Sequence, residues 1–186
     1  MKRILPLSFA LFAFFAASSI AQDTPKGPAT DAHGKDSMAG MQMNKPAVRS
    51  TALTITFGDK TATWSPEALA ALPHVSLTAF NEHVKANQTY SGVPVMALLK
   101  SLGVPDKPHG KDLRLYLVAE GADGYGAAFA VAEVNPDVHI GNVIVADSMD
   151  GKPLGDGGVF QLVADGEKHP ARWVRNLATI KVKSAE

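Results

Sequence analysis

Two groups of polar and aromatic residues have the types and spacing of a ligand-binding site. In Asp123-Gly124-Tyr125, the glycine allows a tight turn and the tyrosine offers an aromatic face with a hydroxyl group. Residues 168–175 read Lys-His-Pro-Ala-Arg-Trp-Val-Arg and combine three permanent cations with one imidazole. Cations gathered in this way bind phosphate or carboxylate groups. We therefore predict a binding site for a small anionic ligand at Asp123, Gly124, Tyr125, Lys168, His169 and Arg172.

Both segments also have a simpler interpretation, as a hairpin turn with a packed aromatic residue and as a solvated basic turn. If they meet in a cleft, we expect Arg172 to bind the anion and Arg175 to contribute less, because Arg175 lies further from the turn. We also expect Leu98, Leu99 and Trp173 to be core residues, because each lies on the apolar face of a regular element.

A different kind of site is suggested by four potential metal ligands near the N-terminus. His33, Met38, Met41 and Met43 lie within eleven residues, and thioether and imidazole donors suit Cu(I). Incidental methionines in a disordered segment are the alternative. The six histidines contain neither the i, i+4 pair of a helical zinc site nor a metalloprotease motif. The chain also lacks a P-loop and a Gly-x-Ser-x-Gly elbow, which argues against nucleotide hydrolases and α/β-hydrolases.

The first residues indicate export from the cytoplasm. Lys2-Arg3 precedes an apolar stretch over residues 7–17, and the small residue Ala21 fits cleavage before Gln22. We expect residues 1–21 to be a signal peptide, and the protein to be periplasmic or secreted, without stable membrane insertion after cleavage. An uncleaved anchor is the alternative, but the apolar stretch is shorter than the roughly 20 residues that a spanning helix needs.

Composition divides the rest of the chain at residue 51. Residues 22–50 contain no aromatic residue and show no hydrophobic period, which is typical of a flexible tether. Residues 51–186 are predicted to form one domain, held by burial alone because the chain has no cysteine for disulfides. Removal of the signal peptide leaves 16 basic against 18 acidic residues, a net charge of −2. This charge does not favour nucleic acid as a partner.

Apolar periodicity within residues 51–186 predicts short strands and short helices. A first helix is expected over residues 66–72 with Ser65 as its cap, a second over residues 95–102 ending at Gly103, and a third over residues 130–134. Strands are predicted over residues 53–57, 61–64, 75–80, 113–118, 124–129, 143–146, 159–163 and 177–182. This order of elements favours the α+β class, in a single compact mixed-sheet domain.

Four segments resemble the molybdopterin-binding domain of the sulfite oxidase family. They are Gly92-Val93-Pro94 before the second helix, Gly124-Tyr125, Asp-Gly-Lys-Pro-Leu at residues 150–154, and Arg172-Trp173-Val174. They occur in the family's order, and the resemblance covers most of residues 51–183. It implies a compact α+β domain in which a pterin lies in a cleft lined by loops, so molybdopterin is a possible cofactor.

The chain departs from this family because it has no cysteine. In the family's enzymes a protein thiolate completes the coordination of molybdenum, and a soft thiolate is not replaced easily by Thr, Ser or Ala. Upstream of the Gly-Val-Pro segment, where the family's cysteine lies, Ser76, Thr78 and Asn81 could bind a small ligand but not a soft metal.

We therefore expect a binding module for a small anion, a pterin-like ligand or a periplasmic protein partner, without catalytic residues. One alternative is a molybdopterin-dependent oxidoreductase without a protein thiolate. The other is a copper-binding protein that acts through its Met/His tether.

Overall fold

The computed structural model describes residues 48–81 and 84–186. The predicted signal peptide and the four predicted copper ligands lie outside the described residues. Two five-stranded sheets and a few short helices make up the domain, which confirms the predicted α+β class. No helix in these two ranges is long and apolar enough to cross a membrane.

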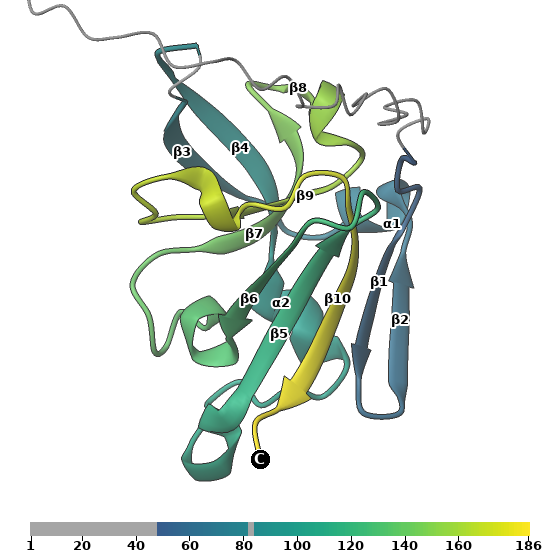
Figure 1. Ribbon diagram of the computed structural model, residues 1–186, viewed down its shortest axis with the longest axis vertical. Helices are drawn as coiled ribbons and strands as arrows, with labels where there is room; N and C mark the ends of the chain where they lie inside the picture. Colours follow the sequence, from purple (N-terminus) through teal and green to yellow (C-terminus); the bar gives the residue numbers. More distant parts are fainter. Residues whose placement is uncertain (1–47, 82–83) are drawn as a thin grey trace, which may run out of the picture. The chain divides into compact units, whose positions relative to one another are not determined.

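The first sheet joins strands from both ends of the domain, in the order β2-β1-β10-β5-β6 (Figure 1). Its strands are β1 (Leu53–Phe57), β2 (Lys60–Trp64), β5 (Leu115–Gly121), β6 (Gly126–Ala130) and β10 (Leu177–Ser184). The β1–β10 pair is parallel and the other pairs are antiparallel. Just before β1, the Ser50 N–H donates to Asn176 Oδ1 over 2.8 Å. Residues 48–50, which composition assigns to the tether, are therefore bonded to the domain at Asn176.

The second sheet has the order β3-β4-β7, with β8 and β9 both paired to β7. Its strands are β3 (Val75–Asn81), β4 (Ala86–Pro94), β7 (Val143–Met149), β8 (Lys152–Pro153) and β9 (Gln161–Ala164). The Gly-Val-Pro segment ends β4, and its glycine lies against β7: a Cβ added to Gly92 would stand 2.2 Å from Val145 O. Only glycine allows the two backbones to approach this closely.

The helices largely follow the sequence pattern. Helix α1 (Pro66–Ala70) is capped by Ser65, whose hydroxyl accepts from Ala68 N–H over 3.2 Å. Helix α2 (Val95–Ser101) is followed by Gly103 with a φ of +90°, as expected for a left-handed C-terminal residue. The 3₁₀ segments are η1 (Gly110–Arg114), η2 (Val131–Val134), η3 (Gly155–Gly157) and η4 (Pro170–Arg172).

Three predicted strands begin two residues later than expected: β5 at Leu115, β6 at Gly126 and β9 at Gln161. The cause is visible at β5. Residues 113 and 114 belong to η1, and β5 starts at Leu115. The reason is local: Asp112 N–H donates to His109 O over 3.1 Å, and this turn competes with the strand.

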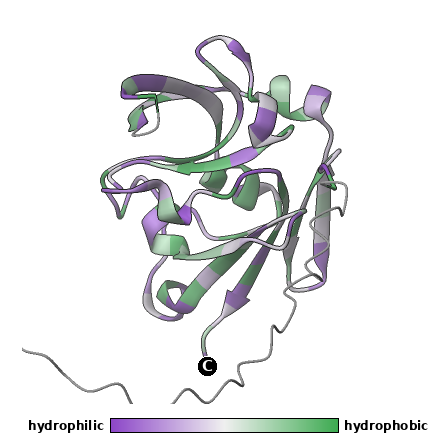
Figure 2. Cartoon of the chain, turned by 45° about the horizontal axis from the view of Figure 1, so that its top comes forward, coloured by the Kyte–Doolittle hydropathy of each residue, from purple (hydrophilic) through white to green (hydrophobic). Residues whose placement is uncertain are grey.

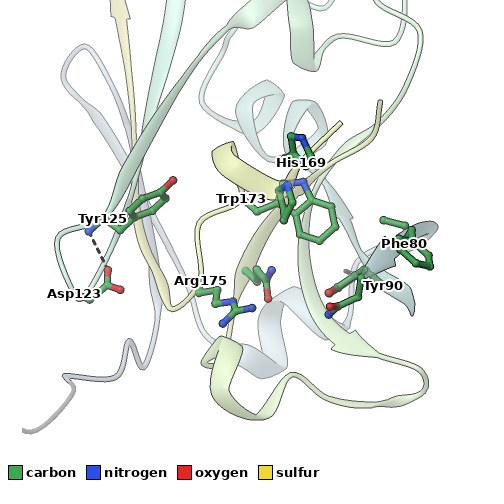
Figure 3. Close-up of a pocket in the computed structure, with 11 residues that line it drawn as sticks. Phe80, Tyr90, Asp123, Tyr125, His169, Trp173 and Arg175 are labelled. Carbon is green, nitrogen blue, oxygen red and sulfur yellow. Dashed lines mark hydrogen bonds between the residues drawn. The ribbon is translucent and has the colours of Figure 1, made fainter. Parts of the chain in front are cut away.

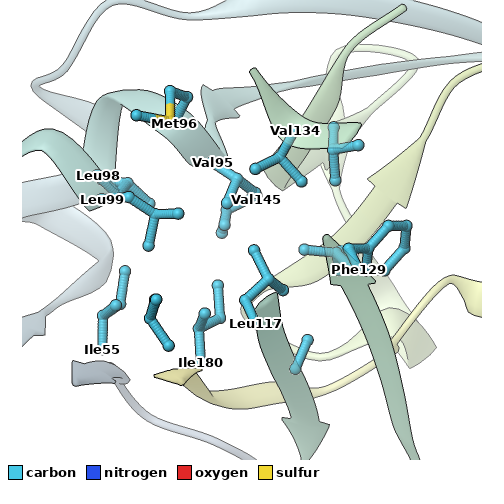
Figure 4. Packing of buried hydrophobic residues seen from close by; sticks show 14 of the residues in the cluster. Ile55, Val95, Met96, Leu98, Leu99, Leu117, Phe129, Val134, Val145 and Ile180 are labelled. Atoms are coloured by element: carbon cyan, nitrogen blue, oxygen red, sulfur yellow. The ribbon is translucent and has the colours of Figure 1, made fainter. Parts of the chain in front are cut away.

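The main hydrophobic core lies between the first sheet, α2 and one face of β7 (Figure 4). The predicted core residues Leu98 and Leu99 are fully buried in it. Strands of mixed hydropathy surround this core, as expected where one face of a strand is covered (Figure 2). Successive side chains of β7 point to opposite faces, so Ile144 and Ala146 belong to a second, smaller cluster on the other face.

Candidate ligand-binding cavity

A cavity of about 450 Å³ opens beside the second, smaller cluster (Figure 3). Strands β3, β4 and β9 contribute to it, together with the β5–β6 turn and the segment that leads from η4 towards β10. Its walls are more apolar than polar. The lining residues are Ala79, Phe80, Asn81, Tyr90, Asp123, Tyr125, Gln161, His169, Pro170, Trp173 and Arg175.

The β5–β6 turn forms one wall because Asp123 and Gly124 give it a tight conformation. Asp123 Oδ1 accepts from Tyr125 N–H over 3.0 Å, and Gly124 has a φ of +87° that favours glycine. The Tyr125 hydroxyl donates to Ala171 O. The predicted turn and the basic segment, 46 residues apart in the chain, are therefore in direct contact.

Two aromatic rings form another part of the cavity. Tyr90 and Trp173 pack edge to face, with ring centroids 5.2 Å apart and planes at 82°. Trp173 Nε1 donates to Ala164 O over 3.0 Å, and burial raises the pKa of the Tyr90 hydroxyl. Trp173 is only half buried, so the prediction of a core residue needs correction. The indole packs against both hydrophobic clusters, and its remaining surface lines the cavity.

Two polar side chains in the cavity are open to a ligand. Gln161 is only 5% exposed, yet its side-chain amide makes no hydrogen bond with the described residues. Arg175 has no ion-pair partner in the same part of the chain. In Figure 3, Arg175 lies between the turn at Asp123 and the ring of Tyr90. An amide and a guanidinium thus face a space in which Asp123 supplies the carboxylate among the lining residues.

Arg172 has different surroundings from those expected, and it does not line this cavity. Its Nε donates to Glu167 over 2.9 Å, and its Nη1 donates to Glu133 over 3.1 Å. The guanidinium also lies 4.3 Å from the centroid of the Phe129 ring. The hydrogen bond to Glu167 raises the pKa of Arg172. The turn of η4 directs Arg172 towards the first sheet, so its charge is already neutralised within the domain.

The remaining predicted residues divide between two hollows. His169 and Asn81 line the main cavity with Asp123 and Tyr125, whereas Lys168 and Thr78 line a neighbouring hollow of about 350 Å³. Sequence reasoning missed the cavity-lining roles of Phe80, Tyr90, Gln161 and Trp173, and it ranked Arg175 below Arg172. One signal for Gln161 was available: it is the single polar residue in the apolar run of residues 159–163.

The side chains of the cavity do not fit a molybdenum ion that needs a protein thiolate. Its donors are amides, phenols, an imidazole, a carboxylate and a guanidinium, and the sequence has no cysteine at all. Among the described residues, no group of three or more His, Cys, Asp or Glu could hold a metal ion.

Comparison with known proteins supports a distant oxidoreductase relative. The chain matches no family model and no curated protein. It is similar to the solved structure of the sulfane dehydrogenase SoxCD from Paracoccus pantotrophus, with 27% sequence identity and a TM-score of 0.55. The match indicates a distant relation. It covers 73% of this chain but only 39% of the SoxCD chain, so this protein spans well under half of that length.

Proposed function

We propose that this domain is a periplasmic or secreted binding module for a small planar ligand that carries an anionic group, such as a pterin. The observation that carries the proposal is the pair of open polar groups, Gln161 and Arg175, in a cavity with aromatic walls. Export is supported by the N-terminal sequence alone. The distant likeness to SoxCD supports a related fold.

The cavity selects the chemistry of its ligand through three features. Gln161 can both donate to and accept from a ligand, because its side-chain amide makes no hydrogen bond with the described residues. Arg175 favours an anionic oxygen, and Asp123 favours a donor on the ligand. Tyr125 and Trp173 offer flat apolar surface. A heteroaromatic molecule with donors, acceptors and one anionic group meets all three needs, whereas an inorganic anion alone leaves the aromatic walls and Asp123 without partners.

A binding role is favoured over molybdenum chemistry because the chain lacks a thiolate. Oxidoreductase activity without a protein thiolate is the competing proposal, suggested by the relation to a dehydrogenase. Metal analysis of the protein produced in a host that makes molybdopterin separates the two. Stoichiometric molybdenum that co-purifies with the protein would favour the oxidoreductase.

The test is calorimetric titration with pterin-6-carboxylate, inorganic phosphate and sulfite. We expect pterin-6-carboxylate to bind most tightly, and Arg175→Gln to weaken it by about 10- to 100-fold, the range for hydrogen bonds to charged groups. Lys168→Gln, which removes a neighbouring cation outside this cavity, is the matched control and should leave affinity unchanged. If the folded wild-type protein binds none of the three compounds, the proposal fails.

A further inference from the structure

Strand β3 forms one edge of the second sheet. Only β4 pairs with it among the described residues, and its seven residues, Val75–Asn81, include no charge and no proline. The other sheet edges are shorter or covered. β2 begins with Lys60, β8 has two residues, Val174 bridges to β9 at Leu162, and η4 packs against β6. Long uncharged edges are templates for another strand, and proteins usually block them.

The hydrogen bonds of Thr89 show which backbone groups of β3 point outwards. Thr89 N–H donates to Asp150 Oδ1, and Thr89 O accepts from Asp150 N–H, each over 2.8 Å, so both groups point away from β3. Opposed residues in an antiparallel pair exchange either two backbone hydrogen bonds or none. Thr78, which opposes Thr89, therefore directs its own N–H and C=O to the free edge. The 3.0 Å contact between the two threonine hydroxyls fits the closer spacing of such a pair.

By the alternation of a strand, Ser76 and Phe80 also direct their backbone groups outwards. Beside them lies the hollow of about 350 Å³, between Thr78–Phe80 on one side and residues 164–168 with Pro170 and Trp173 on the other. Phe80 is 56% exposed there. An incoming strand would find main-chain partners along the edge and space for one apolar side chain, which is the arrangement used in recognition by strand addition.

The charges around the hollow indicate what kind of segment fits. Glu167 is already paired with Arg172, and the remaining charged groups, Asp165 and Lys168, have opposite signs. A charged segment would lose hydration there without gaining a net countercharge. A single segment is favoured over a second copy of this chain, because a second copy would bring its own loop of residues 165–170 to the same edge.

We propose that an extended, uncharged segment of another protein adds as a strand to the free edge of β3. Its backbone pairs with Ser76, Thr78 and Phe80, and one apolar side chain enters the hollow beside Trp173. The open amide and guanidinium belong to the main cavity alone, although the two hollows share Ala79, Phe80, Pro170 and Trp173.

The test uses the whole chain from Gln22 and a fluorescein-labelled, end-capped peptide of alternating threonine and valine with a central phenylalanine, followed by anisotropy. Thr78→Pro removes the outward N–H without removing a bond to β4, and proline is tolerated on edge strands. We expect it to weaken binding at least about tenfold. Thr78→Ala keeps the N–H and is the matched control, with unchanged affinity.

A second measurement does not depend on the folding of the proline variant. The same peptide, N-methylated on the amides that face β3, should not bind to the wild-type protein. Arg175→Gln should bind the unmodified peptide normally, which separates this site from the main cavity. Equal affinity for the methylated and unmodified peptides would overturn the proposal. The proposal would also fail if the wild-type protein formed a dimer that Thr78→Pro dissociated, while the monomer bound no peptide. A second copy of the chain would then be the occupant of the β3 edge.

Discussion

The two faces of the second sheet are built from the same strands, but one face packs into the core and the other supports a cavity. On one face, Val143 and Val145 pack into the main core among fully buried apolar side chains. On the other face, Ile144 and Ala146 support a cavity in which Gln161 and Arg175 remain open. The comparison shows that a sheet can complete its packing on one side and keep unmet hydrogen-bonding capacity on the other, which is where a ligand can gain binding energy.

The largest effect on stability should come from a substitution in the main core. Leu99→Ala should lower the free energy of unfolding by about 2–5 kcal/mol, because Leu99 is fully buried and its truncation leaves a void. The matched control is Leu113→Ala, the same substitution at a leucine that is 51% exposed, with an expected change within about 0.5 kcal/mol. Urea denaturation measures both. Equal losses at the two positions would mean that the core has been assigned incorrectly.

Two amide side chains, Asn135 and Gln161, should respond differently to replacement by leucine. Asn135 is satisfied, since its Nδ2 donates to Asp106 O and its Oδ1 accepts from Asp137 N–H, so Asn135→Leu should destabilise the domain by about 1–3 kcal/mol. Gln161→Leu removes an amide that makes no hydrogen bond with the described residues, and it should change the stability of the ligand-free domain by less than about 0.5 kcal/mol. It should also weaken pterin-6-carboxylate binding about tenfold. Thermal unfolding measures the change in stability, and calorimetry measures the change in affinity. If both variants were destabilised equally, the Gln161 amide would have to be bonded within the domain and not open to a ligand.

Arg172 and Arg175 should differ in their contribution to stability. Arg172→Lys should lower stability by about 1 kcal/mol, because lysine keeps the charge but loses the planar contact with Phe129 and the paired carboxylates. Arg175→Lys should leave the urea midpoint unchanged, since Arg175 has no ion pair in the described part of the chain. A larger loss of stability for Arg175→Lys than for Arg172→Lys would show that Arg175 is the structural residue. Arg172 would then again be the candidate for ligand binding.

The smallest effect concerns a histidine at the start of β3 and is visible as a pH dependence. The His74 ring lies between two acceptors, Leu72 O at 2.7 Å and Asp147 Oδ2 at 2.8 Å, and only the protonated ring can donate to both. The hydrogen bond to Asp147 raises the pKa of His74 above its ordinary value of 6.5. A raised pKa in the folded state means a stabilisation that is complete below the unfolded pKa and is lost as pH rises through the folded one.

The measurement is the difference in unfolding free energy between the wild type and His74→Gln, from about pH 5 to about pH 9. The difference should be largest on the acidic side and shrink above about pH 6.5. A His74 difference that grows as pH rises would mean that the neutral ring is the stabilising form.

Much of the local structure could be predicted because local chemistry decides it. Ser65 caps α1, Gly103 ends α2, and Leu98 and Leu99 face the core, all from the order of neighbouring residues. The Asp123-Gly124-Tyr125 turn depends on one side-chain hydrogen bond and one glycine, so it too is local. The absence of cysteine, which argues against a thiolate-bound molybdenum, is a property of composition alone.

Which side chains line the cavity, and which of them lack partners, depends on contacts between segments that are distant in the chain. Such contacts could not be predicted from neighbouring residues. Whether Arg172 or Arg175 is open to a ligand depends on Glu133 and Phe129, which lie about forty residues away in the chain. Tyr90 and Gln161 reach the same cavity because β7 lies between their strands in one sheet. The sequence by itself determined which residues could turn, cap or bury, because these preferences act between neighbours. The fold determined which polar groups were left without partners, because that depends on every segment that packs against them.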